Sequence, residues 1–102
     1  MDQREALTLA RQYAAAVAHE FRPDKVVLYG SFAQGTASDK SDIDVAVIFH
    51  NFSGDWLRVY TRLSHLRRNV SSFIEPVLLD SANDKSGFVA EVLATGKVIY
   101  QQ

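Results

Sequence analysis

The chain contains no cysteine. This absence excludes disulfides, thiolate catalysis and zinc sites built on thiolates. Basic residues are not in excess either, because 11 of them against 12 acidic residues give a formal net charge of -1, so no global charge attracts the chain to nucleic acid. The apolar runs are too short to cross a bilayer, and the opening residues MDQRE carry no apolar signal region. We expect a soluble, cytoplasmic protein with no membrane partner and no direct nucleic-acid ligand.

The remaining composition suits one ordinary globular domain. A length of 102 residues predicts a single domain over 1–102, and a hydrophobic content of 47% supplies its core. Segments with helical spacing alternate with β-branched runs, which predicts an α/β (or α+β) fold. We predict helices at Asp2–Glu20, Asp55–Val70 and Ser86–Ala94, a helical turn at Phe32–Gln34, and strands at Lys25–Tyr29, Ile43–Phe49, Phe73–Leu79 and Lys97–Tyr100.

Two aspartates stand two positions apart where the second predicted strand begins. Residues at this spacing point to the same face of a strand, so Asp42 and Asp44 share one side while Ile43 and Val45 take the other. Two unpaired carboxylates this close raise each other's proton affinity. A divalent cation removes the conflict, since hard oxygen ligands suit Mg²⁺ or Mn²⁺. The structural alternative is a capping Asp42 and an Asp44 paired with a lysine.

A Gly-Ser pair follows the first predicted strand. A strand that turns into a helix after Gly30 and Ser31 leaves backbone N–H groups pointing outward, where they bind phosphate. Glycine allows close approach of the phosphate, and the Ser31 hydroxyl adds a hydrogen bond. A plain turn with a helix cap is the alternative. Beside a metal pair, however, a phosphate cradle is what attack on the α-phosphate of a nucleotide requires.

These residues form a continuous motif, GSFAQGTASDKSDIDVAV, over 30–47. The motif resembles the Gly-Ser, spaced Gly and Ser-Asp-X-Asp pattern of the DNA polymerase β-like nucleotidyltransferase superfamily, and is most similar to its minimal nucleotidyltransferase (MNT) branch. The resemblance implies a nucleotidyltransferase fold with a small mixed β-sheet and helices packed on one side. It also implies two Mg²⁺ ions, for which Mn²⁺ can substitute, held by Asp42 and Asp44, and nucleotide contacts from Gly30, Ser31, Gly35 and Ser41.

The family pattern requires a third carboxylate on the following strand, which the resemblance implies helps Asp42 and Asp44 to hold the metal. The candidate is Glu75 in FIEPVLL, where the family more often has aspartate. Glu75 shares a strand face with Val77 and Leu79, where a carboxylate without a role is costly. A structural salt bridge is the alternative for Glu75. Pro76 beside it predicts an edge strand or a bulge. Asp80 is the second candidate for the third carboxylate, although its place beside Ser81 at a strand end is more typical of a cap or turn residue.

The resemblance also implies an activity and a partner. The resemblance implies that AMP is transferred from ATP to a tyrosine hydroxyl of a HEPN-domain RNase toxin. This chain would then be the antitoxin, and Glu75 would accept the hydroxyl proton. A chain this short has no second lobe to bind an acceptor, so we expect another chain to supply it. Two alternatives stay open: a binding module that neutralises its toxin by contact, and a small-molecule (antibiotic) nucleotidyltransferase. The preferred nucleotide and the association of two copies also stay open.

The second predicted helix, Asp55–Val70, carries two aromatic residues and several basic ones. Trp56 and Tyr60 fall on its apolar stripe and are predicted to be core residues. The basic face is either a solvated surface or a docking patch for an acidic partner or RNA. It consists of Arg58, Arg62, Arg67 and Arg68, with His65 among them.

Overall fold

A single four-stranded sheet, in the order β3-β2-β1-β4, organises the computed structural model, which describes residues 1–102. β1 pairs antiparallel with both β2 and β4, whereas β2 and β3 run parallel. A parallel pair needs a crossover, which α3 (Trp56–Leu66) provides. β3 lies at the sheet edge, as Pro76 predicted, because proline lacks the N–H that an inner strand needs. The strands are β1 (Lys25–Tyr29), β2 (Ile43–Phe49), β3 (Ile74–Asp80) and β4 (Lys97–Gln101).

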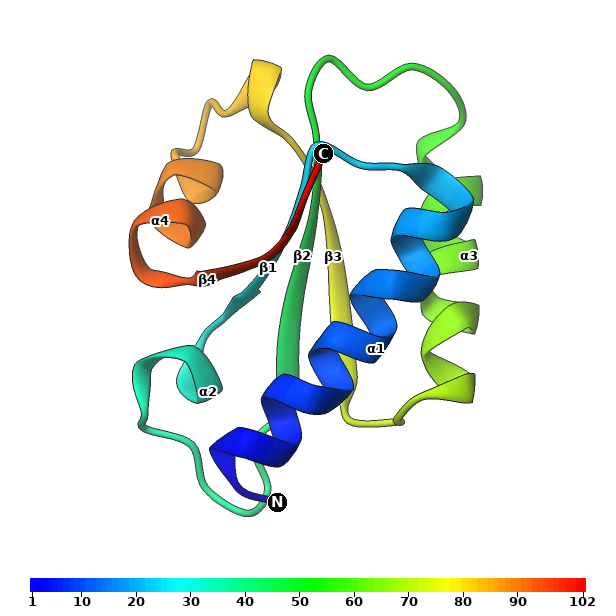
Figure 1. Cartoon of the computed structure of the whole chain (residues 1–102). Coiled ribbons are helices and arrows are strands. Elements are labelled where there is room, and N and C mark those ends of the chain that lie inside the picture. Colours follow the sequence, from blue (N-terminus) through cyan, green and yellow to red (C-terminus); the bar gives the residue numbers. More distant parts are fainter.

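The helices lie on both sides of this sheet (Figure 1). α1 (Gln3–Phe21) and α3 cover one face, and α4 (Phe88–Thr95) packs Val89 and Val92 against Val27 on the other. The predicted α/β fold with a small mixed sheet is confirmed. The expectation that the helices pack on one side is wrong, because α4 covers the face opposite α1 and α3. No helix is long and apolar enough to pass through a bilayer. The remaining helical segments are short: α2 (Ser31–Gln34) and the 3₁₀ turns η1 (Arg67–Asn69) and η2 (Ser81–Asn83).

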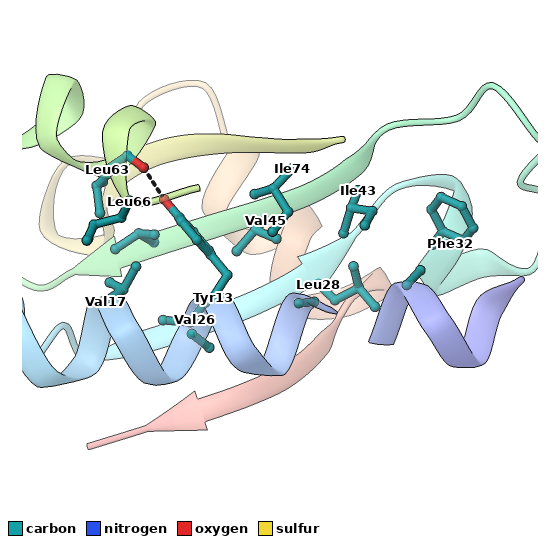
Figure 2. Close-up of a cluster of buried hydrophobic side chains, with 14 of the residues drawn as sticks. Tyr13, Val17, Val26, Leu28, Phe32, Ile43, Val45, Leu63, Leu66 and Ile74 are labelled. Atoms are coloured by element: carbon teal, nitrogen blue, oxygen red, sulfur yellow. Dashed lines mark hydrogen bonds between the residues drawn. The ribbon is translucent and has the colours of Figure 1, made fainter. Parts of the chain in front are cut away.

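The larger core lies between α1, α3 and the sheet, and Tyr13 crosses it (Figure 2). This side chain is fully buried, and its hydroxyl donates a hydrogen bond of 2.7 Å to the backbone carbonyl of Leu63 in α3. Burial raises the pKa of Tyr13, so the phenol stays protonated and keeps donating. This bond joins the two helices that cover one face of the sheet.

Replacing Tyr13 with phenylalanine is expected to lower the free energy of unfolding by about 1–3 kcal/mol. The ring would still fill its space, but the Leu63 carbonyl would lose its buried donor, and an unsatisfied buried acceptor costs that much. Urea unfolding followed by circular dichroism would measure the change. Because both residues are remote from the carboxylates described below, nucleotide binding should be unchanged. A variant as stable as wild type would contradict this role for the hydroxyl.

The predicted core positions at the start of α3 are wrong. Trp56 and Tyr60 are 43% and 40% exposed, whereas Leu63 and Leu66 are buried. The buried stripe of α3 continues through the partly buried Val59, so Trp56 and Tyr60 lie at the edge of this stripe. Trp56 instead packs edge-on against Phe52 in the preceding loop, with ring centroids 5.1 Å apart.

Candidate active site

Three side chains form a row across three strands at one end of the sheet. Tyr29 at the end of β1 pairs in register with Asp44 near the start of β2, and Asp44 pairs with Glu75 near the start of β3. Residues directly opposite in neighbouring strands share one face. Asp42 lies just before β2 begins. The three carboxylates predicted from the sequence therefore come to the same end of the sheet, although Glu75 is distant along the chain.

Gly30 lies directly against Asp44. Its backbone has φ 76° and ψ -153°, a combination that only glycine adopts readily. A Cβ atom added to Gly30 would overlap the Oδ2 atom of Asp44. The sequence explained this glycine by phosphate approach alone. The structure adds a second requirement, since any side chain here would displace the carboxylate.

Hydrogen bonds and the burial of Phe32 hold the turn after Gly30 in place. The Ala33 and Gln34 amides both donate to the Gly30 carbonyl at 3.1 Å and close the single turn of α2. Phe32 is buried in the main core, and the side-chain amide of Gln3 donates to the Phe32 carbonyl at 2.7 Å. Ser31, the first residue of α2, is thus fixed directly after Gly30, the residue that lies against Asp44.

Gly35 and Ser41 shape the loop between α2 and β2. Gly35 ends α2 in the left-handed conformation, with φ 76°, and a Cβ atom there would meet nothing. The Ser41 Oγ accepts a hydrogen bond of 2.9 Å from the Ser38 amide, which closes a turn just before Asp42. Both residues have a structural reason to be present, and their contact with nucleotide stays a prediction.

The carboxylates influence one another electrostatically. Partial burial raises the pKa of Asp44, and the charges of Asp42 and Glu75 raise it further. Burial likewise raises the pKa of Tyr29, with contributions from Asp44 and Glu75. Like charges held this close favour a cation between them. The donor set, hard carboxylate oxygens alone, fits Mg²⁺ or Mn²⁺.

Glu75 differs from its expected environment. Its side chain is 53% exposed, so the argument that burial makes this carboxylate costly is wrong. Its Oε1 lies 3.8 Å from Nη1 of Arg67, a nitrogen that also donates to the carbonyls of Ser72 and Ile74. No three acidic or histidine side chains are arranged as a metal site. Glu75 would therefore have to leave Arg67 to join a cation held by Asp42 and Asp44.

Asp80 is a turn residue, as its sequence context indicated. Its carboxylate accepts hydrogen bonds of 2.8–2.9 Å from the amides of Asn51, Phe52 and Ala82. The Ala82 and Phe52 amides are the main reason that the pKa of Asp80 is lowered. Asp80 lies at the far end of β3 from Glu75 and takes no part in the carboxylate row.

The predicted basic face is partly structural. Arg62 forms a two-pronged ion pair with Glu20 of α1, with distances of 2.7 and 2.8 Å. Arg67 holds the backbone at the start of β3, whereas Arg58 and Arg68 are exposed. The role of Arg67 beside Glu75 was missed from the sequence. Tyr29 was also missed, although its place directly before Gly30, on the strand face of Val27, could have indicated it.

Residues 12–102 match the family described as polymerase beta, nucleotidyltransferase. The chain belongs to this family. Nucleotidyltransferases of this kind generally use a nucleoside triphosphate and a divalent metal ion, which agrees with the acidic row and the Gly-Ser turn. No curated protein matches the chain.

Solved structures share this nucleotidyltransferase fold. A candidate nucleotidyltransferase from Sulfolobus solfataricus is 23% identical, with a TM-score of 0.71 over 98% of this chain and 84% of that one. A toxin–antitoxin structure with AMP-PNP is 23% identical, with a TM-score of 0.65. A mutant of the toxin–antitoxin pair MntA–HpeT is 19% identical, with a TM-score of 0.62. The last two each align with 90% of this chain and 73% of theirs.

Proposed function

We propose that this nucleotidyltransferase transfers AMP from ATP to a hydroxyl of a partner protein, namely a tyrosine of a HEPN-type RNase toxin, and so acts as a cytoplasmic antitoxin. The observation that carries the proposal is the row of Asp44 and Glu75 in register, with Asp42 and Gly30 at its end. Similarity to toxin–antitoxin structures, one of them with AMP-PNP, supports the nucleotide and the kind of partner. The chain would act as one minimal domain over 1–102 and receive its acceptor from the toxin.

In this proposal each residue has a chemical task. Asp42 and Asp44 would hold Mg²⁺, which when bound neutralises charge on the triphosphate. Ser31 would donate its hydroxyl to a phosphate oxygen, and Gly30 would keep the surface open for that approach. Glu75 would accept the proton of the tyrosine hydroxyl. The tyrosine oxygen then bonds to the α-phosphorus, the bond from that phosphorus to the bridging oxygen breaks, and pyrophosphate leaves.

A second candidate is an antitoxin that blocks its toxin by contact without turnover. The 3.8 Å contact between Arg67 and Glu75 favours it, because this carboxylate is directed to an arginine rather than to the aspartates. In that case the acidic row would still bind nucleotide weakly, but the acceptor would never be modified. The two candidates differ in one observable, which is label on the partner.

The test is a transfer assay on the protein with its co-purified partner. With Mg²⁺ and each α-labelled nucleoside triphosphate in turn, we expect label on the partner from ATP only. The Asp42→Asn/Asp44→Asn variant should give no label, whereas Asp39→Asn, the same change at an exposed position of the same loop, should label normally. A stoichiometric complex without label would favour the contact antitoxin. Label on an aminoglycoside or another small hydroxyl compound, with none on protein, would make this an antibiotic-modifying enzyme.

A further inference from the structure

A hollow of about 170 Å³ lies between the end of β1, α2 and α4, beside the carboxylate row. Tyr29 and Gly30 form its side nearest Asp44, Gln34 of α2 lies on another side, and Phe88 and Glu91 of α4 close it. Since one water occupies about 30 Å³ in the liquid, the space suits a single sugar-sized ring rather than a whole nucleotide. Because Gly30 borders both places, a ligand in the hollow can be continuous with phosphates bound at the Gly-Ser turn.

The charge of the hollow indicates which part of a ligand it accepts. No lysine or arginine lines it, and its one charged residue, Glu91, is acidic. A carboxylate without a cation beside it would repel phosphate, so the hollow does not suit the triphosphate. It suits an uncharged part of the same molecule that offers hydrogen-bond donors, since an ionised carboxylate only accepts hydrogen bonds.

The residues that line the hollow also restrict the shape of the ligand that it can accept. Tyr29 and Phe88 pack edge to face, with ring centroids 5.7 Å apart and planes at 86°. Such a pair is rigid and presents an apolar surface to one side of a small ring. Glu91, one turn along α4 from Phe88, has no ion-pair partner within the chain. The Thr95 hydroxyl donates to the Glu91 backbone carbonyl at 2.9 Å rather than to its carboxylate. The Glu91 carboxylate is therefore free to bind a ligand.

From these features we infer that the hollow binds the ribose of the nucleotide, with Glu91 accepting hydrogen bonds from its 2′- and 3′-hydroxyls. A ribose offers two adjacent O–H donors, which match the two oxygens of one carboxylate, and the same pairing recognises ribose in dinucleotide-binding folds. The Tyr29–Phe88 pair would then pack against the sugar ring. The inference rests on the proposed function and extends it, because it makes the protein selective for ribonucleotides over 2′-deoxyribonucleotides.

Calorimetric titration of the protein with α,β-methylene ATP and its 2′-deoxy analogue, both with Mg²⁺, tests this inference without turnover. We expect wild type to bind the ribonucleotide about tenfold more tightly, which is the effect of one hydrogen bond to a charged group. In Glu91→Ala the ratio of the two affinities should fall to about one. Losing a negative charge strengthens binding of both ligands alike, so the ratio is the deciding quantity. Glu5→Ala, the same change on exposed α1, should keep the wild-type ratio.

Three outcomes would overturn the inference. Equal affinities in wild type would show that the ribose hydroxyls are not recognised. A Glu91→Ala protein with the wild-type ratio would place recognition elsewhere. If this variant instead changed the preference among α,β-methylene ATP, GTP and CTP while the ratio stayed the same, Glu91 would contact the base. Failure of wild type to bind either analogue would be a different result, since it would overturn the proposed function together with the ribose assignment.

Discussion

Replacing Asp44 with asparagine is expected to abolish AMP transfer and to raise the melting temperature of the protein. Asparagine keeps the size of the side chain, so the contact with Gly30 survives. The variant loses an anionic metal ligand, which contributes several kcal/mol to charge stabilisation, so activity should fall about 1000-fold or more. It also loses the repulsion from Asp42 and Glu75 that raises the pKa of Asp44. The partner-labelling assay and thermal unfolding measure the two effects.

The raised pKa of Asp44 also determines how the stability of the folded protein depends on pH. Because the folded protein holds this proton more tightly than the unfolded chain, the Asp44 contribution to stability falls as pH rises from the usual pKa of 3.8 through the raised folded value. The asparagine variant should lack this decline. Mg²⁺ should raise the melting temperature of wild type at neutral pH and lose that effect as Asp44 becomes protonated. An active variant, or one that Mg²⁺ stabilises as much as wild type, would contradict the assignment.

Replacing Gly30 with alanine is expected to cause the second large loss. The new methyl group would collide with Oδ2 of Asp44, and the backbone at φ 76° and ψ -153° is unfavourable for alanine. Such backbone strain costs about 1–3 kcal/mol, and displacement of the carboxylate should reduce transfer about 100-fold. Gly35→Ala is the matched control. Gly35 also has a positive φ, but no atom lies close to where its Cβ would be. The substitution should therefore cost about 1–2 kcal/mol in stability and leave Asp44 in place.

A double-mutant cycle can separate collision from backbone strain. If the methyl group collides with the carboxylate, Gly30→Ala should destabilise an Asp44→Ala background less than it destabilises wild type. Gly35→Ala should cost the same in both backgrounds. Additive effects at Gly30 and Asp44 in urea unfolding would mean that the two residues are not in contact, and the steric explanation for Gly30 would have to be abandoned.

Much of the fold is encoded locally and could be predicted. β1 and β2 were predicted with their observed limits, because short β-branched runs flanked by turn residues favour strands. The start of α1 is also encoded locally, because the Asp2 carboxylate accepts a hydrogen bond from the Glu5 amide and caps the helix. The shared face of Asp44 and Glu75 was implied by the family resemblance and is present in the register of β2 and β3.

The rest depends on side-chain and helix placements that no sequence pattern specifies. Arg67 binds the carbonyls of Ser72 and Ile74, only five and seven residues ahead, but its residue type does not indicate this contact, and nothing near Glu75 shows that its side chain is exposed. The exposure of Trp56 depends on a small rotation of α3 about its axis, which periodicity does not resolve when stripes through neighbouring positions are both apolar. The packing of Phe88 on Tyr29 requires knowing that α4 returns to the second face of the sheet.

The parallel pairing of β2 and β3 also bears on when the protein becomes competent during synthesis. A nascent chain that has emerged only through β2 carries both aspartates but no Glu75, and a crossover through α3 must close before the two strands can meet. Non-local parallel pairs are slow to form because loop closure precedes the contacts that stabilise it. The carboxylate row is thus completed late, so partly made chains would carry only part of the proposed site.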